Sequence, residues 1–199
     1  MTPDGAPGPP LFPAAAFLVG ACVGSFLNVL IHRLPREESI VRPSSRCPSC
    51  GRSIRPAENI PLVSFLLLRG RCAGCGTPIS WRYPGVEALT GAGFALFAWG
   101  DGVGFTLARD LVFFSLLVPI VFIDIDHRII PDELSLGGLA AGILLSFLPG
   151  GDWKGSLAGG VLAMRKGSEG LKTAIPYGPY LCAAALIARF LGDSFRRLF

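Results

Sequence analysis

The chain has 199 residues, of which 51% are hydrophobic and 16% are charged, and its formal net charge at pH 7 is +4. Soluble domains carry about 25% charged residues, so this composition, with a mean hydropathy of +0.53, excludes an ordinary soluble protein and predicts an integral membrane protein. The lipid bilayer is therefore the first expected partner. The basic residues are not interleaved with aromatic ones, and we expect no nucleic acid to bind.

The first apolar segment, residues 11–32, follows an N-terminal tail of ten residues. Before its last residue its only clearly polar members are Ser25 and Asn28, and it is long enough to span a hydrocarbon core, which takes about 20 residues. A signal peptide has basic residues before its apolar core, whereas here Arg33 follows it. We predict an uncleaved first membrane helix with its N-terminus outside.

A polar loop domain, residues 33–83, comes next. It holds 9 of the 18 basic residues against three acids, and by the positive-inside rule it is predicted to be cytoplasmic. Within it, Ile60–Leu68 is apolar apart from Ser64 and is too short to span a membrane. We expect this stretch either to pack under the cysteine-bearing part of the loop or to lie on the membrane surface.

The loop contains two matched Cys-x-x-Cys pairs with 21 residues between them: Cys47 and Cys50, then Cys72 and Cys75. A glycine follows each pair and permits the tight turn that directs two sulfur atoms at one ion. Four thiolates fill a tetrahedral zinc site and leave no place for water, so the predicted zinc is structural. Two disulfides or redox dithiols are the alternative, which a reducing cytoplasmic compartment disfavours.

Residues 84–199 are predicted to form a membrane domain. Its apolar stretches are Gly85–Gly100, Val103–Ile123, Leu134–Leu148, the ten residues Gly155–Met164, and Thr173–Leu191. Ten helical residues span only about 15 Å and cannot cross a bilayer unaided. The region 149–170 therefore looks incomplete, and the whole chain is expected to hold five or six membrane segments.

A cluster of acids, within Val121–Glu133, lies at the boundary between two apolar runs. Asp124 directly follows the first run, where desolvation penalises a charge, and this makes it a candidate functional residue. The neighbouring Asp126 is assigned to a solvated turn. Asp132 is expected to cap the helix that follows Pro131.

Several stretches together resemble the type IV prepilin peptidases, also called leader peptidase and N-methyltransferase enzymes. Gly24-Ser25-Phe26-Leu27-Asn28 resembles the family's opening motif. Trp81-Arg82-Tyr83-Pro84-Gly85-Val86-Glu87 resembles the family's return to the membrane, and Ile175-Pro176-Tyr177-Gly178 resembles its signature before the last helix. The resemblance covers nearly the whole chain. It implies an all-α polytopic membrane protein with a small cytoplasmic four-cysteine zinc-ribbon-like insertion.

The resemblance implies two catalytic aspartates. Asp124 matches the first, because an Ile-Pro pair follows it by six and seven residues. Asp152 mimics the second motif, Gly-x-Gly-Asp-x-Lys, but Pro149 replaces the first glycine, and only one helix separates the two acids. Either an internal deletion with its join near Gly159–Arg165 removed the true second motif, or Leu134–Leu148 is a re-entrant hairpin that returns Asp152 to Asp124.

The family's function gives the remaining expectations. A membrane aspartic endopeptidase would cleave the leader peptide after glycine from type IV prepilin or pseudopilin precursors, and N-methylation of the new N-terminus would use S-adenosylmethionine. Such an enzyme, serving type IV pilus assembly or type II secretion, is a multi-pass protein of the bacterial inner (cytoplasmic) membrane. The alternatives are an inactive truncated homologue that acts as a membrane zinc-ribbon binding protein, and a thiol oxidoreductase.

Overall fold

The computed structural model describes residues 11–149, and its regular secondary structure consists of helices. Its elements are α1 (Leu11–Arg33), η1 (Leu34–Arg36), η2 (Pro56–Glu58), α2 (Val63–Leu67), α3 (Arg82–Asp101), α4 (Phe105–His127) and α5 (Asp132–Ser146). Between residues 11 and 149 there is no β-strand, only isolated bridges. The predicted helical class is confirmed. The chain divides into two compact units, Met1–Val118 and Pro119–Phe199, and each is described by itself.

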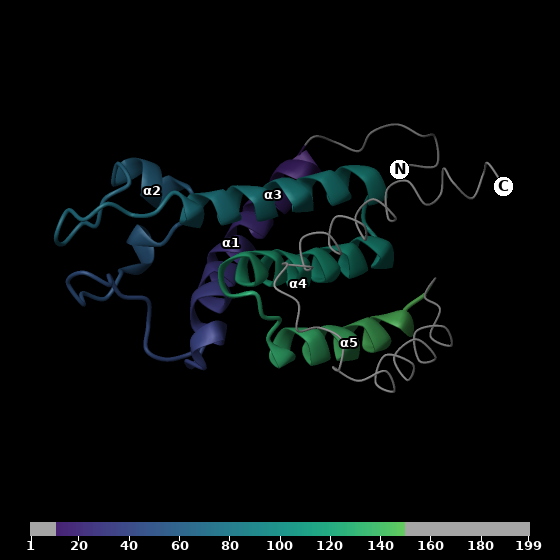
Figure 1. The fold of residues 1–199 in the computed structure, drawn as a ribbon. Helices are drawn as coiled ribbons and strands as arrows, with labels where there is room; N and C mark the ends of the chain where they lie inside the picture. The colour runs from purple at the N-terminus through teal and green to yellow at the C-terminus, as the bar shows by residue number, and fades with distance from the viewer. Residues whose placement is uncertain (1–10, 150–199) are drawn as a thin grey trace. The chain divides into compact units, whose positions relative to one another are not determined.

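Helices α1 and α3 of the first unit pack closely against each other (Figure 1). Glycines make this approach possible: a Cβ atom at Gly20 would lie 2.8 Å from the Thr90 carbonyl oxygen, and one at Gly24 would lie 2.8 Å from the Glu87 Cα. Gly20 meets Thr90, and Gly24, further along α1, meets the earlier residue Glu87 of α3. The two helices therefore run antiparallel. Small residues at such an interface allow two helix backbones to come together in a membrane.

We expect Gly24→Val to destabilise the first unit by about 1–3 kcal/mol, because the added carbons must displace the backbone of α3. Gly85→Ala is the control, since a Cβ atom there meets nothing within 4 Å and alanine is the better helix former. The measurement is thermal unfolding of both variants in detergent. Equal losses of stability would contradict a close helix contact at Gly24.

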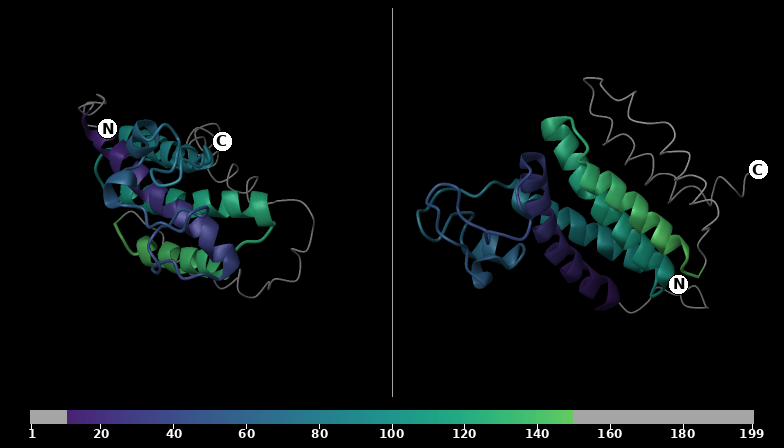
Figure 2. Two further views of the ribbon diagram at one scale, coloured as in Figure 1. Left: turned by 90° about the vertical axis from the view of Figure 1, so that its left-hand side faces the viewer. Right: turned by 90° about the horizontal axis from the view of Figure 1, so that it is seen from below.

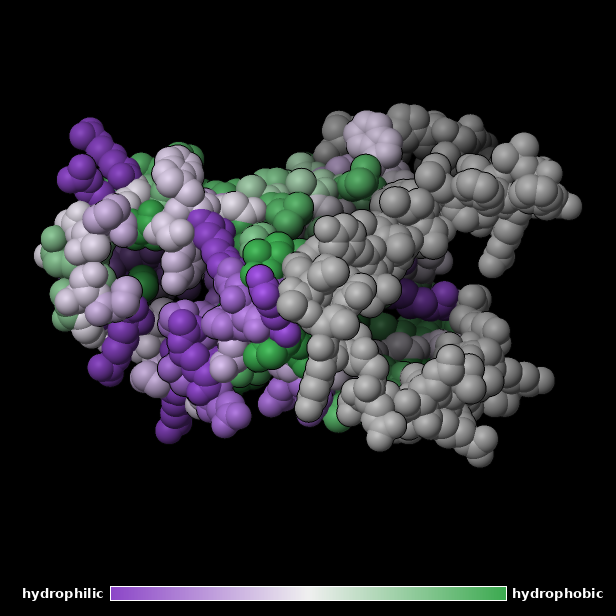
Figure 3. All heavy atoms as spheres, viewed as in Figure 1, coloured by the Kyte–Doolittle hydropathy of each residue, from purple (hydrophilic) through white to green (hydrophobic). Residues whose placement is uncertain are grey.

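Two described helical stretches, Leu11–Arg36 and Phe105–His127, are long and apolar enough to cross a membrane. Both carry exposed large apolar side chains, among them Leu18, Phe26 and Phe113. Hydrophobic residues cover much of the visible face of α3 in Figure 3, whereas hydrophilic residues gather around the last turn of α1 and the segment after it. These features support a membrane protein. The total of five or six segments stays a prediction.

Helix α4 continues past the predicted end of its apolar run at Ile123 and includes Asp124 and Asp126 in its last turns. Pro119 lies inside this helix, where it removes one backbone hydrogen bond, and the boundary between the two units falls directly before it. The acids predicted to follow the first apolar run are therefore presented from a helix end and not from a turn.

The predicted capping role of Asp132 is wrong. The N-cap of α5 is Pro131, without a side-chain cap, and Asp132 is the first helical residue. Because the helix begins one residue earlier than expected, the carboxylate lies in the first turn, where the helix dipole favours negative charge.

Several predictions lie outside the described residues: the tail 1–10, Asp152, the join near Gly159–Arg165 and the final apolar segment Thr173–Leu191.

Candidate metal centre and catalytic aspartate

The loop between α1 and α3 lies at one end of this helix pair and carries the cysteines on two similar hairpins (Figure 2). In each hairpin the amide of the first cysteine, Cys47 or Cys72, donates to the carbonyl oxygen five residues later at 2.9 Å. The glycines after the pairs, Gly51 and Gly76, have φ of +69° and +73°. This left-handed conformation strains any residue with a Cβ atom, which explains why glycine occupies both turns.

The four sulfur atoms converge. The Sγ atoms of Cys47, Cys50, Cys72 and Cys75 all lie within 4.8 Å of one another, and those of Cys47 and Cys75 are 3.8 Å apart. A zinc ion with Zn–S bonds of about 2.3 Å sets tetrahedral sulfur atoms about 3.8 Å apart. A disulfide needs sulfur atoms about 2.05 Å apart, and all four cysteines are free. The donor set therefore fits a four-thiolate metal site.

Hydrogen bonds favour the thiolate, the metal-binding form, at two of the four cysteines. The Thr77 hydroxyl, 3.2 Å from the Cys75 sulfur, and the Thr77 amide lower the pKa of the Cys75 thiol to about 6. The amides of Cys75 and Gly74 lower the pKa of Cys72. At Cys50 a backbone hydrogen bond from Arg52 acts in the same direction, but contacts with the other thiols and desolvation raise its pKa to about 11.

An ion pair joins the first hairpin to η2. The Arg52 guanidinium lies 2.7 Å from the Glu58 carboxylate, which also accepts a hydrogen bond from the Arg55 amide at 3.2 Å. This amide, and then the Arg52 side chain, lower the pKa of Glu58. Sequence patterns gave no role to either partner, because an arginine and a glutamate six residues apart are common in polar loops.

Two buried polar residues hold this end of the first unit together, one by joining the loop to α3 and the other by joining α1 to α3. The Leu62 amide donates to the Glu87 carboxylate at 2.8 Å, and the Asn28 side-chain amide donates to the Tyr83 carbonyl oxygen at 3.1 Å. Asn28 is 7% exposed and Glu87 8%. The sequence marked both as polar residues in apolar stretches, which is the available signal, but only the structure shows what they hold.

A cavity of about 470 Å³ lies between the cysteine loop and the adjoining ends of α1 and α3. Its charged and polar lining includes Asn28, Arg33, Arg52, Glu58 and Glu87. The volume falls in the range of small-molecule sites, about 300–1,000 Å³. The cavity therefore has the size and the mixed charge for a polar ligand.

Asp124 lies near the end of α4 and is buried, at 5% exposure, whereas Asp126 two residues later is exposed. The backbone carbonyl of Asp124 accepts a hydrogen bond from the Arg128 amide at 2.9 Å. Arg128, with φ of +56°, leaves the helical conformation directly after the last turn. The two acids thus differ in solvation as their sequence positions suggest. The catalytic role of Asp124 stays a prediction, since its proposed partner Asp152 lies outside the described residues.

Apolar helices of spanning length and a loop with four converging cysteines define the class: a helical membrane protein whose loop carries a four-cysteine cluster. Residues 18–100 match the family model of the bacterial peptidase A24 N-terminal domain. The chain is 53% identical over 154 residues to a prepilin leader peptidase/N-methyltransferase of Myxococcus xanthus and 39% identical over 163 residues to one of Neisseria gonorrhoeae. A third relative, from Pseudomonas aeruginosa, matches over nearly the whole length of both chains. The chain therefore belongs to the prepilin leader peptidase/N-methyltransferase family.

Coverage differs among these relatives. The matches include 76% and 70% of this chain but 46% and 56% of the two relatives, so the chain spans about half their length. The Pseudomonas aeruginosa relative is 30% identical over 275 positions, which include 96% of this chain and 94% of that protein. These 275 positions exceed the 199 residues of the chain by 76. At least 76 positions within the match therefore have no counterpart in this chain, as an internal deletion requires. No solved structure matches the chain.

Proposed function

We propose that the chain is a prepilin leader peptidase that cleaves the leader peptide after glycine from type IV prepilin or pseudopilin precursors. Family membership supports the reaction class. The observation that carries the proposal for this chain is the buried carboxylate of Asp124 at the end of an apolar helix. Such a position is costly for a carboxylate and is typical of functional acids.

The chemistry needs two carboxylates. Two of them at short distance do not both ionise, so one keeps a proton while the other takes a proton from the water that attacks the peptide carbonyl. Asp124 is proposed as one member of the pair and Asp152 as the other. The precursor would approach from the cytoplasmic side, with its basic leader in water and its apolar helix in the bilayer.

N-methylation of the new N-terminus is the second proposed activity. S-adenosylmethionine, when bound, supplies the methyl group. The cavity beside the cysteine loop fits such a ligand in volume and in its mixture of charges. Arg33 and Glu58 in its lining supply the positive and negative charge that the ligand's carboxylate and amine require.

The metal at the four cysteines is proposed to be a structural zinc ion, because four protein ligands complete its coordination. We further propose that the protein lies in the bacterial inner membrane with its N-terminus outside and residues 33–83 in the cytoplasm, as the excess of basic residues in this loop suggests.

A specific observation favours a second candidate function. The match to the Pseudomonas aeruginosa relative leaves at least 76 positions without a counterpart in this chain, and the second catalytic motif of the family can be among them. The chain would then be an inactive homologue that binds precursors through its cysteine-bearing loop and its membrane helices.

The deciding experiment mixes the purified full chain in detergent with a prepilin that carries a basic leader and a glycine cleavage site. Mass spectrometry measures leader loss, and co-purification measures binding. Cleavage after the glycine supports the peptidase. Binding without cleavage supports the inactive homologue, and the absence of both contradicts the two proposals together.

A further inference from the structure

A face of large apolar side chains is exposed where the loop meets α3. Its members are Ile60, Val63, Leu66, Leu67 and Trp81, and we call it the interfacial face. The exposed fraction of these residues ranges from 47% for Ile60 to 77% for Leu67, and Trp81 is 75% exposed. Contiguous exposed apolar residues of this size mark a surface that contacts a partner or a membrane.

The packing of α1 and α3 places this face at a definite depth. Because the helices are antiparallel and the Asn28 side chain donates to the Tyr83 carbonyl, the first turn of α3 lies level with the last turns of α1. The apolar part of α1 ends there, at His32 and Arg33. Trp81, directly before α3, therefore lies where the hydrocarbon core gives way to the headgroups, the level that tryptophan prefers.

Helix α2 is held at the same level. The rings of Phe65 and Trp81 meet edge to face with centroids 4.7 Å apart, and the Leu62 amide is bound by Glu87. Leu62 has φ of +61°, a conformation that costs a residue with a Cβ atom of order 1–3 kcal/mol. Contacts that hold such a conformation fix the direction of the helix, so Leu66 and Leu67 stay on the outer side while Phe65 is buried.

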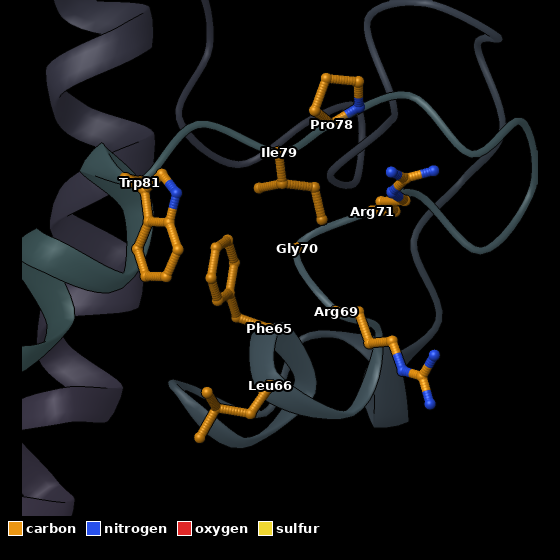
Figure 4. A pocket seen from close by; sticks show the side chains of 8 residues that line it. All are labelled: Phe65, Leu66, Arg69, Gly70, Arg71, Pro78, Ile79 and Trp81. Atoms are coloured by element: carbon orange, nitrogen blue, oxygen red, sulfur yellow. The ribbon is translucent and has the colours of Figure 1, made fainter.

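A shallow cavity of about 420 Å³ opens beside the interfacial face (Figure 4). Phe65, Leu66 and Trp81 lie on one side of it, and the guanidinium groups of Arg69 and Arg71 lie on the other. Guanidinium groups bind phosphate oxygens through paired hydrogen bonds. An apolar side at the level of the membrane boundary and a basic side next to it fit a molecule with a phosphate head and a hydrocarbon tail.

We propose that the interfacial face is a lipid-binding surface, in which Leu66, Leu67 and Trp81 enter the bilayer boundary while Arg69 and Arg71 bind phosphate groups of anionic phospholipids. The occupant is the bilayer because the face continues the lipid-exposed surface of the α1 and α3 pair and the adjacent charges are basic. This surface would hold the cysteine-bearing loop close against the membrane. The inference goes beyond the peptidase and does not depend on its activity.

The first test measures depth with a tryptophan reporter in the full chain. Trp81, Trp99 and Trp153 are replaced by Phe, Leu66→Trp is added, and the protein is placed in nanodiscs whose lipids carry brominated acyl chains. We expect strong quenching at position 66 and none for the control reporter Ser49→Trp on the first hairpin. Equal quenching at positions 66 and 49 would overturn the proposal. A reporter at position 66 that is shielded from water but not quenched by the lipid would also overturn it, because a protein then covers the face.

The second test measures headgroup preference by native mass spectrometry of the full chain with phosphatidylglycerol and phosphatidylcholine. Each arginine near an anionic surface changes affinity by about fivefold, so the pair R69Q and R71Q is expected to lose most of the preference for phosphatidylglycerol. The control pair R42Q and R55Q removes the same charge from exposed positions of the loop and is expected to keep it. If both pairs lose the preference for phosphatidylglycerol equally, net charge alone explains the preference, and the assignment to Arg69 and Arg71 is overturned.

Discussion

Asp124→Asn is expected to abolish leader cleavage by the full chain. Asparagine has nearly the shape of aspartate but neither holds nor accepts the proton that the attacking water gives up, and loss of such a group lowers the rate by about 10²–10⁴-fold or more. The measurement is the initial rate of leader release from a prepilin, followed by mass spectrometry.

The matched control is Asp126→Asn. It removes the same charge two residues along the same helix, from an exposed position, and is expected to keep the wild-type rate. A rate that Asp124→Asn leaves unchanged would remove Asp124 from the mechanism. A rate lowered equally by both substitutions would show that the net charge at this helix end matters and that a particular carboxylate does not.

Cys72→Ser is expected to release the metal and unfold the cysteine-bearing loop. Wild-type protein should hold one zinc ion per chain, because four sulfur atoms converge at one point, and the variant should hold far less. Structural zinc sites in peptides contribute apparent binding free energies of about 10–16 kcal/mol, more than a small loop gains from its own packing. Elemental analysis measures the zinc, and trypsin cleavage at the arginines of the loop measures the unfolding.

Cys22→Ser is the control, since this exposed cysteine lies on α1 outside the group of four, and it should keep full zinc and a resistant loop. A metal-free wild type whose paired thiols oxidise reversibly would favour the thiol oxidoreductase over the zinc ribbon. Retention of stoichiometric zinc by Cys72→Ser would exclude this cysteine as a ligand.

The internal gap bears on both results. If the second aspartate of the family is among the positions without a counterpart, Asp124 has only Asp152 as a possible partner. The zinc prediction is independent of this question, because all four cysteines lie within the matched residues 18–100. Loss of zinc from Cys72→Ser, together with a wild type that binds the precursor without cleaving it, would therefore support the inactive homologue.

Local chemistry alone was enough for part of the fold. The apolar run of α1 and the four cysteines were predictable because length, hydropathy and ligand spacing act within short stretches of chain. The positive φ of Gly51 and Gly76 follows from the same local requirement for a tight turn. Asp124 was singled out for a similar reason, since it directly follows an apolar run.

Contacts between distant segments could not be predicted in this way. Gly20 and Gly24 look like ordinary small residues in α1 until α3 lies against them, and Glu87 looks like a misplaced charge until the Leu62 amide meets it. For Ile60–Leu68 the sequence left two positions open, and the structure shows that Phe65 packs inward while Leu66 and Leu67 are exposed.

The sequence by itself thus determined the class of the protein, the four cysteines that come together and the candidate acid, because spanning length, thiol spacing and a charge at an apolar boundary are properties of single segments. Tertiary structure alone decided how α1 and α3 approach, which polar groups fasten the loop, and which side of α2 faces outward. These depend on burial and on partners that lie far apart in the sequence, as Asn28 and Tyr83 do at a separation of 55 positions.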